Sequence, residues 1–323
     1  MLLLAFIVVI GLCIGSFLNV VILRALSKES IVFPASKCPK CQHPLKWWHN
    51  IPVLSYIILR GKCGFCKEKI SIQYPIIEIL TAIIFLLISL NNGITPGTLY
   101  GWVVASLFIV LAATDWKEKI VFNRHLYALI GTGIIYSAIT TIVLAFMYST
   151  TPGFSVSTYL LNSPITMSLL GTILGFVVME IVARIGYLVA GDRAFGEGDS
   201  YIAAGIGAVF GWKILLVTLV LSVIIQTLIT LPIFIKKEYQ NKNWMILISL
   251  GTFTIYTCAF IMAQQFGWLN NTFAYAASTI VLCIIGVLTC REILAGLKNP
   301  ENRTYLPFGP AMITAAMIFL LSI

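Results

Sequence analysis

Residues 1–23, MLLLAFIVVIGLCIGSFLNVVIL, decide the fold class of this chain. The stretch carries no charged residue and is longer than the about 20 apolar residues that take an α-helix across a bilayer. A secretory signal begins with positive charge and ends at a small-residue cleavage site, whereas here the first basic residue, Arg24, follows the apolar stretch. We therefore expect a retained transmembrane helix whose N-terminus lies outside the cytoplasm.

The rest of the chain repeats this pattern. Hydrophobic residues make up 59% of the 323 residues and charged residues only 10%, against about 25% charged in soluble domains. The sequence predicts an all-α polytopic membrane protein of about ten transmembrane segments with a small cytoplasmic insert. We expect spans near 1–23, 74–90, 98–114, 125–147, 164–190, 200–211, 212–235, 244–266, 271–290 and 306–323, of which 200–211 is short for a crossing.

The basic residues indicate how the chain is oriented. Twenty of the 21 Lys and Arg residues lie in or beside the loops 24–73, 115–124, 191–199, 236–243 and 291–305, and only Lys213 falls on the opposite side. This asymmetry is typical of cytoplasmic loops. It predicts that both termini lie outside the cytoplasm. It also assigns the net charge of +9 to topology and argues against nucleic-acid binding.

Five segments follow from this reading. They are the first span at 1–23, a cytoplasmic zinc-binding domain at 24–73, a transmembrane catalytic core at 74–235, an extra hairpin with its loops at 236–305, and a last span at 306–323. Three G-x-x-x-G pairs fall within the spans, and we expect them to let helices pack closely. The pairs are Gly11/Gly15, Gly171/Gly175 and Gly207/Gly211.

Loop 24–73 carries two C-x-x-C motifs separated by twenty-one residues: Cys38, Cys41, Cys63 and Cys66. This spacing suits a tetrahedral Cys₄ zinc site, which is structural because it leaves no coordination position open. A reducing cytoplasm disfavours the alternative of two disulfides. His43 and His49 could substitute as ligands, although we expect them to be ordinary loop residues.

Two carboxylates stand where spans meet the cytoplasmic boundary. Asp115 ends an apolar run, and Asp199 ends Gly196-Glu-Gly-Asp at the mouth of another span. Two carboxyl groups that share one proton can perform aspartyl-protease chemistry, because one activates a water and the other donates to the scissile carbonyl. Gly196 and Gly198 would allow an extended substrate to approach closely. The alternative is that each Asp caps a helix or faces water.

Other acids compete for roles in this site. Asp192 and Glu197 are rivals for the second carboxylate, and Asp192 is the better placed of the two to cap a turn. Glu78 and Glu180 are predicted to lie within the membrane, where acids are costly and often functional. Structural hydrogen bonds or ion pairs, with Arg24 or Arg184 as partners, are equally compatible with their positions.

Five motifs, in this order, resemble the type IV prepilin peptidases, also called leader peptidases. They are the 11–24 run, the cysteine module containing Asn50-Ile-Pro-Val-Leu-Ser-Tyr56, the exit Tyr74-Pro-Ile-Ile-Glu78, Gly196-Glu-Gly-Asp199, and Pro307-Phe-Gly-Pro310. The resemblance places the catalytic pair on Asp115 and Asp199 and the zinc ligands on the four cysteines. It implies cleavage after a Gly in the short basic leader of prepilins or pseudopilins.

The resemblance further implies that members with the Cys₄ loop N-methylate the new terminus with S-adenosylmethionine. No methyl-donor motif is visible in the residues themselves. The chain departs from the family pattern at Tyr201, where many members have a basic residue, at Phe122, where proline is usual, and in the extra hairpin 244–290. These departures leave the substrate preference, and whether the chain methylates its product, open.

Three alternatives remain open from the sequence. The chain could be a peptidase without methyltransferase activity. It could be an ion-coupled transporter that uses intramembrane carboxylates, although this would require internal repeats with broken helices. It could also be a zinc-dependent membrane scaffold whose acids only cap helices.

Overall fold

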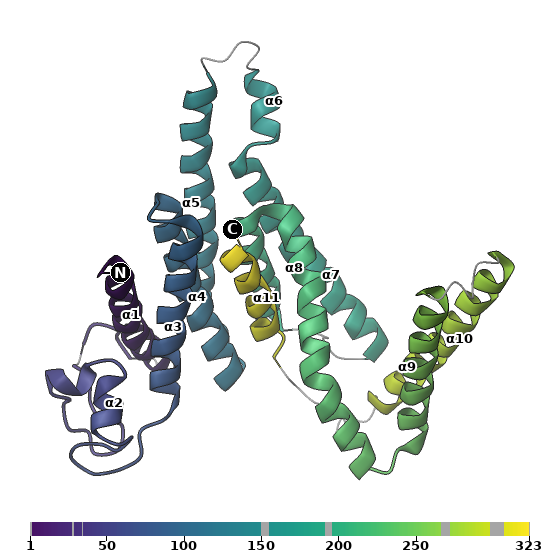
Figure 1. Ribbon diagram of the computed structural model, residues 1–323, viewed down its shortest axis with the longest axis horizontal. Helices are drawn as coiled ribbons and strands as arrows, with labels where there is room; N and C mark the ends of the chain where they lie inside the picture. Colours follow the sequence, from purple (N-terminus) through teal and green to yellow (C-terminus); the bar gives the residue numbers. More distant parts are fainter. Residues whose placement is uncertain are drawn as a thin grey trace. The chain divides into compact units, whose positions relative to one another are not determined.

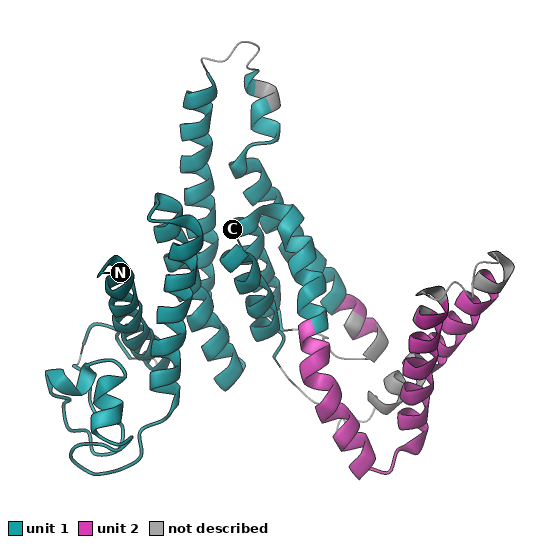
Figure 2. Ribbon diagram, viewed as in Figure 1, with its two compact units in different colours: residues 1–183, 195–224, 307–323 teal, residues 184–194, 225–306 magenta. Residues whose placement is uncertain are grey.

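The computed structural model describes residues 2–27, 29–33, 35–149, 155–190, 196–265, 272–297 and 307–322. The chain divides into two compact units (Figure 2), the first comprising Met1–Ala183, Phe195–Ile224 and Pro307–Ile323, and the second Arg184–Ala194 and Ile225–Leu306. In chain order the helices are α1 (Leu2–Ser27), the 3-10 helix η1 (Trp47–Asn50), α2 (Leu54–Ile58), α3 (Gln73–Asn92), α4 (Pro96–Glu118), α5 (Asn123–Tyr148), α6 (Val156–Leu161), α7 (Pro164–Ala190), α8 (Glu197–Gln240), α9 (Trp244–Gln265), α10 (Thr272–Leu297) and α11 (Gly309–Ser322) (Figure 1).

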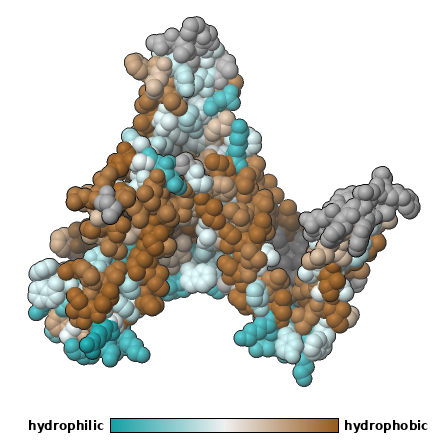
Figure 3. All heavy atoms as spheres, in the orientation of Figure 1, coloured by the Kyte–Doolittle hydropathy of each residue, from teal (hydrophilic) through white to brown (hydrophobic). Residues whose placement is uncertain are grey.

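Apolar helices dominate the chain, as its composition predicts. Within the described residues, six helices are long and apolar enough to cross a membrane, namely α1, α3, α4, α5, α7 and α8, and shorter apolar stretches lie in α9, α10 and α11. Hydrophobic side chains cover the flanks of these helices (Figure 3). The predicted all-α membrane fold is therefore confirmed, and each expected span falls on a helix.

Helix α8 contains a break that explains two of the expected spans. Gly211 has φ 77° and ψ 172°, a conformation that is not helical and that only glycine adopts readily. A side chain there would also meet Cβ of Met167 at 3.3 Å. The break separates 200–211 from 212–235, the boundary that the hydropathy pattern predicts, and it leaves Lys213 exposed just after the bend.

The G-x-x-x-G pairs pack helices as predicted. A Cβ on Gly11 would lie 2.5 Å from Cα of Ala82, and one on Gly15 would lie 2.6 Å from Cα of Glu78, so α1 and α3 touch through their backbones. In the same way, α7 and α8 meet at Gly171 against Gly207. Larger residues at these positions would force the helix axes apart.

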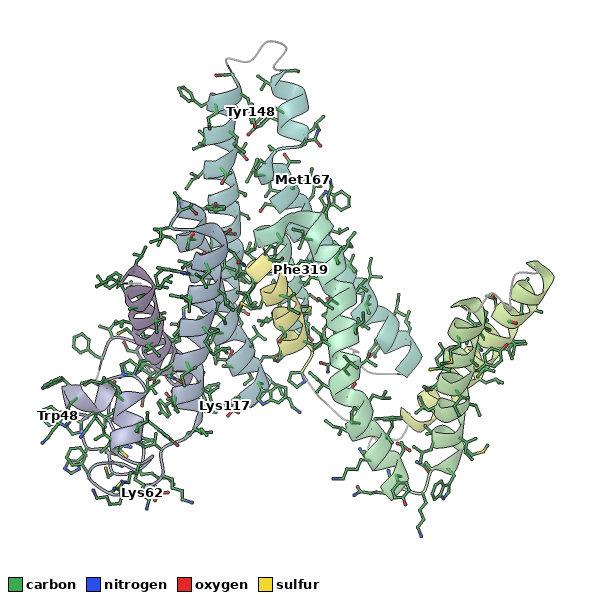
Figure 4. The ribbon with its side chains drawn as sticks, in the orientation of Figure 1. Trp48, Lys62, Lys117, Tyr148, Met167 and Phe319 are labelled. Atoms are coloured by element: carbon green, nitrogen blue, oxygen red, sulfur yellow. The ribbon has the colours of Figure 1, made fainter. Side chains whose placement is uncertain are left out.

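The first unit aligns the ends of four helices. Helix α1 packs on α3, α3 on α4, and α4 on α11. Successive helices run in opposite directions, so the C-terminal ends of α1 and α4 lie at the same end as the start of α3. Figure 4 shows Lys117, near the end of α4, toward the same end as Lys62 and Trp48 of the cysteine module, whereas Tyr148 lies at the opposite end.

Some elements differ from the expectation. Helix α1 runs on to Ser27, and α4 runs on to Glu118, so Asp115 lies inside the last turn of a helix and not after it. Short helices η1 and α2 form between the two cysteine motifs, and α6 forms between the expected spans 125–147 and 164–190. Helices this short depend on contacts with the rest of the fold, so hydropathy does not reveal them.

Candidate active site and metal centre

Asp115 lies on the buried face of α4. Only 5% of its surface is exposed, and Leu111 and Thr114 beside it are fully buried. Its Oδ2 atom has no hydrogen-bond partner among the described residues. The start of α11 faces this carboxyl group, because a Cβ built on Gly309 would overlap Oδ2 of Asp115. A buried carboxylate oxygen that lacks a hydrogen-bond partner is costly, which argues against a purely structural role.

Asp199 lies in the first turn of α8 and is 8% exposed. Its Oδ2 accepts a hydrogen bond from the backbone amide of Gly196 at 3.1 Å. This is half of a capping box, in which the third helical residue caps the amide that precedes the helix. One oxygen of Asp199 therefore does cap the helix, as the capping alternative predicted. The same hydrogen bond holds the carboxyl group in place.

The two carboxyl groups come together although 84 positions separate them in the sequence. They are close enough to interact electrostatically with each other, and the backbone amide of Gly309 interacts with both. The site is thus built from the end of α4, the start of α8 and the start of α11, all within the first unit. Two buried acids beside one backbone donor can share a proton and hold a water.

The glycines around Asp199 have different surroundings. A Cβ on Gly198 would lie 2.8 Å from Cγ2 of Val121, so this glycine lets the start of α8 approach the α4–α5 connection. Gly196 supplies the amide described above. Glu197 is exposed at the start of α8. Asp192, the other rival acid, lies outside the described residues.

The two predicted intramembrane acids are placed on different helices. Glu78 of α3 is 6% exposed, and its Oε2 accepts a hydrogen bond from the backbone amide of Val53 at 2.7 Å. It therefore links α3 to the cysteine module. Glu180 is half-buried on α7. Arg24, considered as a partner for these acids, donates from Nη1 to the carbonyl oxygens of Ser30 and Ile31 at 2.8 and 2.9 Å.

The four cysteines form one cluster. Their sulfur atoms all lie within 4.8 Å of one another, and the Sγ atoms of Cys38 and Cys66 are 4.0 Å apart. A tetrahedral zinc with Zn–S bonds of about 2.3 Å places sulfur atoms about 3.8 Å apart, so this donor set fits zinc. The cluster, as far as the chain is described, includes no histidine. His43 instead stacks on Phe65, with ring centroids 4.8 Å apart.

The two knuckles share one backbone design. The amide of Cys38 donates to the carbonyl oxygen of His43, and the amide of Cys63 donates to that of Glu68. The residue four positions after the first cysteine of each knuckle has positive φ, 58° at Gln42 and 60° at Lys67. The repeated turn presents each sulfur pair to the same point, as a tetrahedral metal centre requires.

The cluster also favours a cation electrostatically. Backbone amides of Cys66 and Phe65 lower the pKa of the Cys63 thiol to about 6. The amide of Glu68 acts in the same direction on Cys66, but burial and the neighbouring thiols raise the pKa of that thiol to about 11. Four thiolates so close together need a bound cation to offset their mutual repulsion.

Comparisons with known proteins identify the family of this chain. The bacterial peptidase A24 N-terminal domain matches residues 9–92, and the type IV leader peptidase family matches residues 102–231. A prepilin leader peptidase/N-methyltransferase of Klebsiella pneumoniae is 31% identical over 68% of this chain and 90% of the relative. The chain belongs to the type IV leader peptidase family.

Other relatives of this chain carry the same name. The Neisseria gonorrhoeae protein is 31% identical over 67% of this chain and 77% of its own length. The Myxococcus xanthus protein is 35% identical over 65% of this chain, and the match spans 57% of that relative. No solved structure matches the chain.

The two family matches include the predicted metal and catalytic residues but not the C-terminal helices. All four cysteines fall in the first matched segment, and both Asp115 and Asp199 fall in the second. Helices α9, α10 and α11 lie beyond both segments. Gly309 in α11 is the site residue that sequence reasoning missed, because the Pro307–Pro310 motif marked the position without indicating that it faces Asp115.

Proposed function

We propose that this chain is a membrane aspartyl endopeptidase that removes the short basic leader of type IV prepilins or pseudopilins at the cytoplasmic face of the inner membrane. The observation that carries the proposal is the meeting of two buried carboxyl groups, Asp115 and Asp199, beside the Gly309 amide. The names of the relatives and the family membership support the substrate class.

The chemistry needs only groups that this site contains. One carboxylate takes a proton from a water molecule, and that water attacks the scissile carbonyl carbon. The other carboxyl group, which keeps the shared proton, donates a hydrogen bond to the carbonyl oxygen. The Gly309 amide adds a second donor at the site, in the manner of a preorganised backbone dipole. The carboxyl group that took the proton from water then donates it to the leaving amine as the peptide bond breaks.

The proposal extends to zinc, methylation and sidedness. Zinc bound by Cys38, Cys41, Cys63 and Cys66 would fix the fold of the cytoplasmic module. The relatives are also named N-methyltransferases, and we propose that this chain methylates the new N-terminus with S-adenosylmethionine. The basic residues of the module and of the α4–α5 connection support a cytoplasmic position for both the module and the site.

Substitution of the acids tests the peptidase. Asp115→Asn and Asp199→Asn remove the proton-sharing pair while keeping shape, and we expect each to lower leader cleavage by about 10³-fold or more. Glu118→Gln is the matched control, because this acid lies three residues beyond Asp115 and is exposed. The measurement is cleavage of a prepilin in detergent by the purified variants. Near-normal cleavage by either Asn variant would remove the basis of the proposal.

A further inference from the structure

A cavity of about 420 Å³ lies between the cysteine module and the ends of α1 and α3. Its walls include Val20 and Leu23 of α1, Tyr56 of α2, and Tyr74 and Glu78 of α3. All of these residues belong to the first unit. The volume falls in the range of about 300–1,000 Å³ that is typical of small-molecule sites, and it is small for an extended peptide.

The lining of this cavity has distinct chemical regions. Glu78 and Glu29 supply negative charge, while Arg24 and Lys37 supply positive charge. Tyr56 and Tyr74 add aromatic rings, and the remaining wall combines aliphatic side chains with small polar ones. Such a mixture suits a ligand that has a cationic centre, an acidic group and a flat aromatic part. It does not suit a polyphosphate, because the acids would repel one.

Val53, whose amide bonds to Glu78 of the cavity wall, has an unfavourable backbone conformation. Val53 has φ 61°, and a β-branched residue rarely adopts a positive φ. Its amide donates to Glu78 at 2.7 Å, so the carboxylate of α3 stabilises this turn of the module. Backbone strain of this kind persists where the surrounding structure fixes it, often beside ligands. Tyr56, three residues further on, lines the cavity.

We propose that this cavity is the binding site for S-adenosylmethionine. The inference rests on the methyltransferase half of the proposed function and adds where the donor binds. The donor carries a sulfonium cation, which the carboxylates of Glu78 and Glu29 would attract. Its carboxylate suits Arg24 and Lys37, and its adenine suits the rings of Tyr56 and Tyr74.

The position of the cavity agrees with the order of the two reactions. The cavity lies where α1 ends and α3 begins, and Asp115 lies in the last turn of α4, at the same end of the first unit. A new N-terminus released at the acid pair is therefore on the same side as the donor. Cys38 and Cys63 also line the cavity, so the metal centre would hold one of its walls in place.

A filled cavity tests the assignment. Ser55 lines the cavity from α2, whereas Ile57 of the same helix does not and is 63% exposed. In the full-length protein in detergent, we expect Ser55→Trp to weaken binding of S-adenosylmethionine at least tenfold, as measured by calorimetry. Zinc content and leader cleavage should stay unchanged. Ile57→Trp is the matched control and should bind like the parent.

The other outcomes distinguish a failure of the site assignment from a failure of the proposed function. Unchanged binding by Ser55→Trp would overturn the site assignment and leave the proposed function standing. A parent protein that cleaves leaders but binds no donor would overturn both the site and the methylation half. If Ser55→Trp loses its zinc, the test is photolabelling of the parent protein by tritiated S-adenosylmethionine, which shows where the donor binds. Label on peptides carrying Tyr56 or Tyr74 supports the cavity, and label confined elsewhere overturns it.

Discussion

At the scale of single residues, Gly309 sets how close α11 comes to the acid pair. A Cβ at this position would overlap Oδ2 of Asp115 and would lie 2.8 Å from Cδ1 of Ile202. Neither neighbour can move easily, because Ile202 is fully buried and Asp115 is on a packed helix face. The site therefore has room for glycine at position 309 and not for a larger residue.

We expect Gly309→Ala to lower leader cleavage by about 10²-fold, because a displacement of about 1 Å at reacting groups has an effect of that size. The measurement is the initial rate of prepilin cleavage at equal amounts of membrane-inserted protein. Gly131→Ala provides the control, since nothing lies within 4 Å of a Cβ there and alanine favours a helix. Equal rates for Gly309→Ala and the parent would show that α11 does not shape the site.

Glu78 offers a second prediction at this scale. Glu78→Leu leaves the Val53 amide without its acceptor, and the loss of a hydrogen bond to a charged group costs about 1.5–3 kcal/mol. We expect lower thermal stability and faster proteolysis between residues 29 and 72. Glu78→Gln keeps an acceptor oxygen and should behave closer to the parent. A Leu variant as resistant to protease as the parent would exclude this link.

At the scale of elements, helix α8 is two helical segments joined at Gly211. A non-glycine residue with the φ and ψ of Gly211 costs about 1–3 kcal/mol. We therefore expect Gly211→Ala to lower the free energy of unfolding by about that amount, seen as a lower Tm in detergent. Gly131→Ala again serves as the control. A Tm that stays constant or rises would mean that the bend at 211 is not required.

The elements also show what hydropathy can and cannot predict. The long helices, the break at 211 and the glycine contacts follow from local patterns, because spans and small-residue pairs are written into consecutive residues. The link from Glu78 to the Val53 amide and the approach of Gly309 to Asp115 are not local. They depend on which surfaces meet in three dimensions, and no spacing along one segment encodes that pairing.

At the scale of the whole molecule, the cysteine module and the acid pair occupy different parts of the first unit. The module rests on the ends of α1 and α3, whereas the acids belong to α4 and α8. Zinc binding and folding are coupled in small metal modules. Loss of the metal should therefore affect the module and its cavity more than the acid pair.

Cys41→Ser tests this separation. We expect it to lower bound zinc from about one ion per chain to a small fraction, since structural sites need four ligands. Methylation of the trimmed terminus should be lost, while leader cleavage should retain a measurable part of its rate. The measurements are metal analysis and mass spectrometry of the product. Cys283→Ser is the control, because Cys283 lies in α10 and is not one of the four clustered cysteines. Full methylation by metal-free protein would contradict the prediction.

The order of Asp115, Asp199 and Gly309 along the chain has a consequence for synthesis in the cell. The first two are translated well before the third, so a nascent polypeptide on the ribosome carries both acids without the α11 backbone that covers them. Under the proposed function, we expect hydrolysis to begin only after α11 has been made. Truncated translation products would accumulate as inert membrane proteins and would not cut prepilins prematurely.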